Sequence, residues 1–147
     1  MLDIIVKRFP ELTTGELYTV LRLRTEVFVV EQNCIYQDLD GKDEIALHVI
    51  GKSKGIIVAY ARIFGPEDYF EQASIGRVVV DRNERKYGYG KDIMNAAINT
   101  IYKKFHKTGI KLSAQCYLQQ FYESLGFLPR GDSYLEDGIP HIAMFKN

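Results

Sequence analysis

The sequence predicts an α/β (α+β) fold in a single domain that spans residues 1–147. Short apolar runs bounded by glycine or proline indicate strands, and apolar residues spaced three or four apart indicate helices. These patterns alternate in the order strand, helix, loop, three strands, helix, strand, helix and two strands. A chain of 147 residues without a visible linker is long enough for one core and too short for two.

The first third of the chain predicts a strand, a helix and a long loop. Residues 2–9 are rich in isoleucine and valine, and Pro10 ends that strand. Thr13 and Glu16 form a capping-box pattern, so we expect a helix to follow. Residues 31–44 lack periodicity and include an acidic run, which predicts a loop of the kind that often carries function.

A hairpin, a third strand and a second helix follow. Residues 45–50 and 56–64 predict two strands around the turn 51–55, and residues 74–80 predict another strand. A repeat of apolar residues every four positions predicts a helix that begins near Lys91.

The last third of the chain predicts short elements. Gly109 is expected to end the second helix, because glycine readily adopts the left-handed conformation found after helices. The remaining elements are a strand at 110–116, a helix at 118–125 ended by Gly126, and strands at 127–130 and 139–145 joined by an acidic loop at 131–138.

Composition excludes several classes of protein. The formal net charge is zero, which argues against sequence-independent binding of nucleic acid. The sequence has no apolar run that could span a bilayer and no secretion signal, so we expect no membrane partner and a cytoplasmic location. Cys34 and Cys116 lie far apart and are expected to be free thiols. The scattered histidines predict no metal site.

The turn at residues 82–90, between a strand and a helix, carries the clearest chemical signal. Gly88 and Gly90 allow backbone amides to approach a ligand, and the following helix adds its unpaired N-terminal donors. The nearby cations are Arg82, Arg85, Lys86 and Lys91. The expected ligand is therefore a phosphate or pyrophosphate.

Two other phosphate-binding loops do not fit this turn. The dinucleotide fingerprint requires a third glycine where Ile93 stands. A Walker A loop requires serine or threonine where Asp92 follows Gly90 and Lys91.

Residues 85–90 instead resemble the R/Q-x-x-G-x-G/A signature of the GCN5-related N-acetyltransferases (GNAT superfamily). Residues 121–127 resemble the Tyr-x-x-x-Gly-Phe segment of that family, and the order of elements matches over nearly the whole chain. The resemblance is closest to the ElaA-like branch, and the segments that carry it are 23–24, 27–34, 36–38, 60–62, 75–78 and 136–141. It implies a mixed, largely antiparallel sheet of about seven strands flanked by about four helices.

The resemblance also implies acetyl-CoA as co-substrate and a set of residues that bind it. Backbone groups of the strand before the turn would bind the pantetheine arm and polarise the thioester carbonyl. Tyr122 would reach the leaving sulfur, and a hydrogen bond is expected there because a phenol is a weaker acid than a thiol. The cofactor-binding residues expected are Val78, Val79, Val80, Arg85, Lys86, Tyr87, Gly88, Tyr89, Gly90 and Lys91.

The acceptor amine must lose a proton, and the sequence leaves the base open. His48 and His141 are slightly favoured because imidazole titrates near neutral pH, although either could be hydrogen-bonded within the sheet instead. The carboxylates of the two acidic loops are the other candidates for this role. As a hypothesis, these loops also attract a cationic acceptor through Glu31, Glu44 and Glu136.

Together these patterns predict transfer of an acetyl group from acetyl-CoA to a primary amine by direct attack in a ternary complex. The acceptor is left open among a small molecule, a polyamine and a peptide amine. The alternative is a non-catalytic acyl-CoA-binding or sensing module. An acetylated Cys116 intermediate and an aminoacyl-tRNA substrate are disfavoured. The sequence does not decide between monomer and homodimer, and it assigns no role to Arg77.

Overall fold

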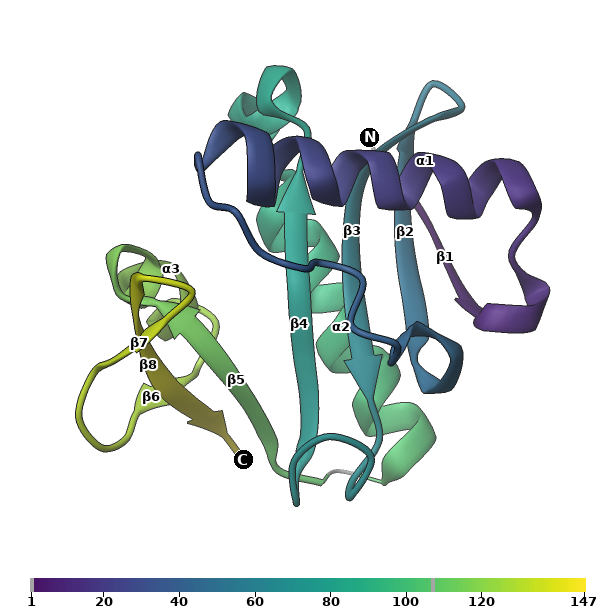
Figure 1. The fold of residues 1–147 in the computed structure, drawn as a ribbon. Helices are drawn as coiled ribbons and strands as arrows, with labels where there is room; N and C mark the ends of the chain where they lie inside the picture. Colours follow the sequence, from purple (N-terminus) through teal and green to yellow (C-terminus); the bar gives the residue numbers. More distant parts are fainter. Residues whose placement is uncertain (1, 107) are drawn as a thin grey trace.

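The computed structural model describes residues 2–106 and 108–147 (Figure 1). Its elements are β1 (Asp3–Arg8), η1 (Phe9–Glu11), α1 (Thr14–Thr25), η2 (Glu26–Glu31), η3 (Asp43–Ile45), β2 (Leu47–Ser53), β3 (Ile56–Phe64), β4 (Ala73–Val80), η4 (Arg82–Tyr87), α2 (Tyr89–Phe105), β5 (Ile110–Gln115), η5 (Cys116–Leu118), α3 (Gln119–Glu123), β6 (Leu128–Pro129), β7 (Tyr134–Glu136) and β8 (Ile139–Lys146). The η segments are 3-10 turns, except η2, which is a π-helix.

One eight-stranded sheet has the order β1-β2-β3-β4-β5-β8-β6, with β7 also paired to β8. Among the described residues, β4 and β5 form the one parallel pair, and all other paired strands are antiparallel. The expected α/β fold with a mixed, largely antiparallel sheet is thus confirmed.

Helices α1 and α2 cover opposite faces of the β1–β4 half of the sheet (Figure 1). On the α2 side, Ile93, Met94, Ala97 and Ile101 enter the larger apolar core. On the α1 side the core consists of Val20, Leu23, Val27, Ile50, Tyr60 and Val79. No helix in the described part of the chain combines the length and the apolarity needed to cross a membrane.

Strand β4 carries a β-bulge in its middle. Gly76 lies opposite Arg62 and Val79 opposite Tyr60, so Arg77 and Val78 together face Ala61. Arg77 has a φ of +50°, which a non-glycine residue rarely adopts inside a strand. The left-handed residue of this bulge is thus Arg77 and not the adjacent Gly76.

Strands β4 and β5 separate soon after they meet. They pair only through Ala73 with Ile110 and Ser74 with Lys111. Beyond that point the two strands diverge (Figure 1). Among the described residues, the inner backbone edges of both strands therefore have no partner strand over most of their length.

The capping box at Thr13 and Glu16 is confirmed, since each side chain accepts the other's backbone N–H, at 3.0 and 2.9 Å. The hairpin turn is shorter than expected and consists of Lys54 and Gly55, both with positive φ, because a two-residue turn matches the strand twist.

The prediction that Gly109 ends α2 is wrong. His106, at φ +58°, ends the helix and donates its N–H to Tyr102 O.

Strand β7 was missed by the sequence patterns. All three of its residues are exposed, so it lacks the apolar alternation that identifies a strand. It forms a hairpin with β8 around Asp137 and Gly138, whose φ values are +52° and +77°. This hairpin brings part of the predicted acidic loop next to β5.

Candidate functional site

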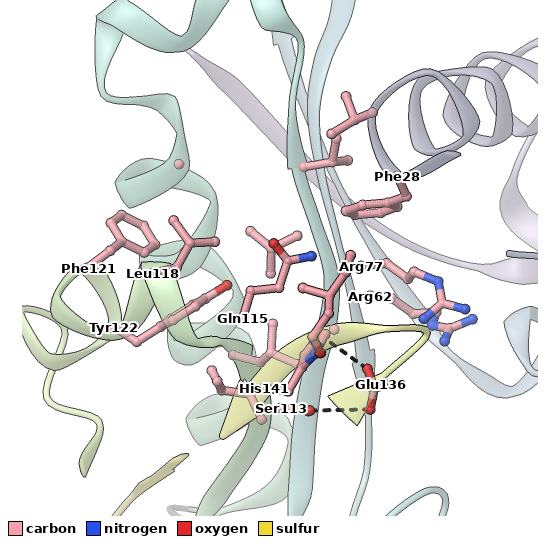
Figure 2. A pocket seen from close by; sticks show the side chains of 18 of the residues that line it. Phe28, Arg62, Arg77, Ser113, Gln115, Leu118, Phe121, Tyr122, Glu136 and His141 are labelled. Atoms are coloured by element: carbon pink, nitrogen blue, oxygen red, sulfur yellow. Dashed lines mark hydrogen bonds and ion pairs between the residues drawn. The ribbon is translucent and has the colours of Figure 1, made fainter. Parts of the chain in front are cut away.

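A cavity of about 590 Å³ lies between β4 and β5 and extends to the start of α2 (Figure 2). It exists because pairing between the two strands stops at Ser74. The predicted residues that line it are Glu31, Val78, Val79, Val80, Arg85, Gly88, Gly90, Lys91, Tyr122, Glu136 and His141.

The N-terminus of α2 forms one end of the cavity. Gly88 precedes the helix with a φ of +74°, and a Cβ there would meet no atom within 4 Å. The first helical hydrogen bond runs from Asp92 N to Gly88 O at 3.3 Å, so the amides of the first turn have no acceptor within the helix. Free donors and the positive helix end make this a site for an anion.

Three residues predicted to bind the cofactor lie outside the described cavity lining: Lys86, Tyr87 and Tyr89. Tyr89 is buried in the core on the α2 side, and Tyr87 is 54% exposed. Successive residues of a helical turn face different directions, which explains why neighbours in this turn differ in whether they line the cavity. The expected contacts of this turn are made by backbone amides, so cofactor binding through the main chain of these three residues stays a prediction.

Arg85 is held by the protein's own groups. Its Nη1 and Nη2 donate to the two carboxylate oxygens of Glu31, at 2.6 and 2.8 Å, and its Nε donates to Val80 O at 3.2 Å. The hydrogen bonds from Arg85 lower the pKa of Glu31. Glu31 therefore lines the cavity as the partner of Arg85, between η2 and the turn, and its contact with an acceptor stays a prediction.

Tyr122 comes from α3 and points its hydroxyl into the cavity (Figure 2). The helix ends directly after it, with Phe127 N donating to Tyr122 O at 3.1 Å and Gly126 at φ +95°. Burial, with a smaller contribution from Tyr117, raises the pKa of Tyr122 to about 12. The side chain is a firmly protonated hydrogen-bond donor.

His141 and Glu136 lie together at the other end of the cavity (Figure 2). His141 Nδ1 donates to Ile139 O at 2.7 Å, because a carbonyl oxygen can only accept. In neutral His141 the lone pair is therefore on Nε2, which lies 3.4 Å from a carboxylate oxygen of Glu136. Ser113 donates to Glu136 at 3.4 Å and hydrogen-bonds to the hydroxyl of Tyr134.

The structure places His48 elsewhere, which corrects its assignment as a base. It is 1% exposed, and it is not among the described residues that line the cavity. Its Nδ1 lies 2.6 Å from the Tyr60 hydroxyl and its Nε2 lies 2.9 Å from Asp43 O. Burial lowers the pKa of His48. Glu44 is exposed on η3, also outside the described lining, and is likewise withdrawn.

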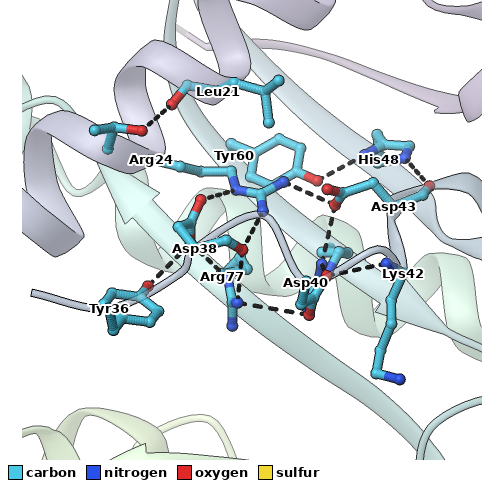
Figure 3. A network of polar contacts seen from close by, with 12 residues as sticks. Leu21, Arg24, Tyr36, Asp38, Asp40, Lys42, Asp43, His48, Tyr60 and Arg77 are labelled. Carbon is cyan, nitrogen blue, oxygen red and sulfur yellow. Dashed lines mark hydrogen bonds and ion pairs between the residues drawn. The ribbon is translucent and has the colours of Figure 1, made fainter. Parts of the chain in front are cut away.

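A buried network of three arginines and three aspartates supports the loop between η2 and η3 (Figure 3). Arg24 from α1 is fully buried and donates to Asp38 at 2.9 Å and to Asp43 at 2.8 Å. Arg62 from β3 donates to both oxygens of Asp40, at 2.9 and 2.8 Å, and to Asp43 at 2.9 Å. The three aspartates of the acidic run are thus neutralised within the protein.

Arg77 connects this network to the bulge of β4. Its Nε lies 2.7 Å from Asp38 Oδ1, and its Nη2 donates to Asp38 O at 2.9 Å. Because Arg77 is itself the left-handed residue, these contacts hold the bulge in place. Arg77 also lines the cavity, so the network fixes one of its walls.

The network predicts a loss of stability in acid. Burial alone would raise the pKa of Asp40, but the hydrogen bonds and charge of Arg62 outweigh it and lower the pKa from 3.8 to about 2. A depressed folded pKa means that the stabilisation, about 2 kcal/mol, is present above about pH 4 and is lost as the pH falls through about 2. We expect Asp40→Asn to flatten the fall in the free energy of unfolding between pH 4 and 2, measured by urea denaturation. Asp132→Asn is the exposed control, and equal slopes in both variants would contradict the prediction.

Comparison with known proteins identifies the family. Residues 14–147 match the family described as "Acetyltransferase (GNAT) domain". The protein belongs to this family. The GNAT chain is also 44% identical over 138 residues to Protein ElaA of Escherichia coli, covering 92% of this chain and 90% of that protein.

Solved GNAT structures agree with the architecture. An acyl-CoA N-acyltransferase from Pseudomonas aeruginosa has a TM-score of 0.94 and 41% identity, with complete coverage of both chains. Escherichia coli ElaA has a TM-score of 0.93 and 40% identity, also with complete coverage. The chain therefore belongs to the ElaA-like branch of the GNAT superfamily, whose fold supports acyl transfer from coenzyme A.

Proposed function

We propose that this GNAT protein transfers an acetyl group from acetyl-CoA to a primary amine by direct attack in a ternary complex. One observation carries the proposal: a single cavity joins the N-terminus of α2 to the Tyr122 hydroxyl and to the His141–Glu136 pair. An anion site, a hydrogen-bond donor for a leaving sulfur and a candidate base therefore open onto the same space.

The residues present fit acetyl-CoA at one end of this cavity. The first-turn amides of α2 and the side chain of Lys91 would hold the diphosphate, and the open space beside Gly88 leaves room for it. The unpaired edge of β4 along Val78, Val79 and Val80 would bind the pantetheine arm through main chain. A backbone N–H of the same edge would polarise the thioester carbonyl.

The other end of the cavity contains the groups that would bind the acceptor amine and remove its proton. Glu136 attracts the ammonium form, and His141 Nε2 accepts the proton that the attacking nitrogen releases. The new N–C bond forms as the C–S bond breaks, and the Tyr122 hydroxyl donates a hydrogen bond to the departing sulfur. With a Tyr122 pKa of about 12, full proton transfer to a thiolate would be uphill by about 5 kcal/mol. The sulfur is therefore stabilised by the hydrogen bond and gains its proton afterwards.

Thiol release measured with acetyl-CoA and a panel of primary amines tests the proposal. We expect release at least tenfold above the rate without amine, with mass spectrometry identifying the N-acetyl product. Tyr122→Phe should lower kcat about tenfold to a hundredfold, because it loses only the hydrogen bond to sulfur, and should leave the Kd for CoA within threefold. Tight CoA binding without amine-dependent release would instead indicate a non-catalytic acyl-CoA-binding module.

A further inference from the structure

The acceptor end of the cavity combines one region of unpaired negative charge with an aromatic wall backed by cations. We propose that the acceptor is a monoamine with a flat apolar body, an arylalkylamine in class, and not a polyamine or a lysine-rich peptide. This inference rests on the proposed acetyl transfer to an amine and narrows its substrate.

Charge within the acidic loop does not favour a polycation. The three aspartates at positions 38, 40 and 43 face three arginines at 2.7–2.9 Å, so their charges cancel in pairs. Of the cavity-lining carboxylates in the described chain, Glu31 is also paired with arginine. Glu136 and its neighbour Asp137 remain without an arginine or lysine partner within 4 Å among the described residues. One ammonium can be neutralised at this place, and the lining that the structure describes offers no second region of carboxylates free of arginine for another.

Aromatic side chains line the part of the cavity where β4 and β5 meet. Phe64, Tyr69 and Phe70 all contribute to the lining. The rings of Phe64 and Tyr69 stack at a centroid distance of 4.9 Å, and Tyr69 meets Phe70 edge-to-face at 4.7 Å. Such a wall suits a flat apolar group, because aromatic pairs gain from offset and edge contacts beyond the area that they bury.

A cationic side chain of the protein lies near the centre of each of these three rings. Arg62 lies 4.8 Å from the centre of Phe64, Lys111 Nζ lies 4.1 Å from that of Phe70, and Lys42 Nζ lies 5.7 Å from that of Tyr69. No carboxylate lies within 4 Å of either lysine nitrogen in the described chain. A distal ammonium placed against this wall would approach the charges of Lys42 and Lys111, whereas a neutral aromatic body would not be repelled by them.

Competing substrates test this arrangement. The probes are phenethylamine, butylamine and putrescine, compared by kcat/KM with acetyl-CoA saturating. Phenethylamine should exceed butylamine at least fivefold through ring contacts, and butylamine should exceed putrescine at least tenfold because putrescine adds a second ammonium to a chain of the same length.

Three variants and one control variant separate the contributions of the site. Phe70→Leu should reduce the preference for phenethylamine over butylamine at least threefold, because it removes a ring from the wall. Lys111→Gln should raise the relative rate of putrescine at least threefold, whereas Lys103→Gln, on the exposed side of α2, should leave all ratios unchanged. Glu136→Gln should raise KM for all three amines at least tenfold.

The outcomes distinguish this inference from the proposed function. A preference for putrescine over phenethylamine, or substrate ratios that Phe70→Leu and Lys111→Gln both leave unchanged, would overturn the monoamine assignment while amine acetylation stands. Absence of thiol release with every amine would overturn the proposed function and this inference together. Calorimetry with CoA shows in either case whether the cofactor end of the site is intact.

Discussion

His141→Ala is expected to lower kcat for amine acetylation about 10²–10⁴-fold, the range typical for loss of a general base. Among the cavity-lining residues described, His141 is the one histidine, and its bond to Ile139 O leaves Nε2 as the acceptor in the neutral ring. The KM for acetyl-CoA should change less than threefold, because the anion site lies at the other end of the cavity. Steady-state kinetics with separate variation of each substrate measures both values.

His48→Gln provides a control of the same residue type. His48 bonds to Tyr60 and Asp43 in the buried network, so its loss should lower the melting temperature while the folded fraction keeps its kcat within threefold. If His141→Ala also keeps kcat within threefold, the base is another group and the assignment of His141 is wrong.

Local patterns in the sequence predicted much of the fold. The capping box at Thr13 and the hairpin of β2 and β3 depend on neighbouring residues, which a single sequence displays directly. The end of α2 was misplaced because two residue types can adopt positive φ there, and His106 does so before Gly109 is reached. Strand β7 was missed because its stability comes from pairing with β8 and not from an apolar face.

The site was predictable where a motif occupies one stretch of chain. The turn at Gly88 and Gly90 and the short helix with Tyr122 were both found in this way, and both line the cavity. The two histidines could not be separated, because each lies on a strand and only the structure shows that His141 lines the cavity and that His48 is enclosed.

Sequence patterns did not predict the arginine–aspartate network. Its members come from α1, the following loop, β3 and β4, so no spacing within one element reveals them. Arginine inside an apolar stretch, as at Arg62 in β3, was the available signal, since a buried charge requires a partner. Arg77, without a role from sequence, proves to hold the bulge of β4.

Gly90→Val is expected to weaken binding of acetyl-CoA about a hundredfold, and Gly90→Ala at least tenfold. A Cβ at this position would lie 3.6 Å from Phe121 and 3.9 Å from Val80, which are ordinary contact distances with two cavity-lining side chains. We therefore expect the folded protein to accept the alanine, with the added atom narrowing the cavity at the start of α2. The loss is expected in Kd by calorimetry, with the melting temperature of Gly90→Ala within about 3 °C of the parent.

The ion pair between Glu31 and Arg85 offers a matched comparison. The double variant Glu31→Gln/Arg85→Gln removes both charges and keeps the net charge of the protein. Since the carboxylate already neutralises this guanidinium, we expect the Kd for acetyl-CoA to change less than threefold. A substitution of Glu31 or of Arg85 alone would leave the charge of its partner unpaired near the proposed diphosphate site. Its effect on the Kd would then combine the loss of one charge with the exposure of the other.

Calorimetric titration of acetyl-CoA into these two variants tests most directly whether main-chain amides at the start of α2 hold the diphosphate. We expect Gly90→Ala to lose at least tenfold in affinity and the Glu31→Gln/Arg85→Gln protein to lose less than threefold. Full affinity in folded Gly90→Ala, together with a large loss in the double variant, would show that the guanidinium and not the backbone holds the cofactor.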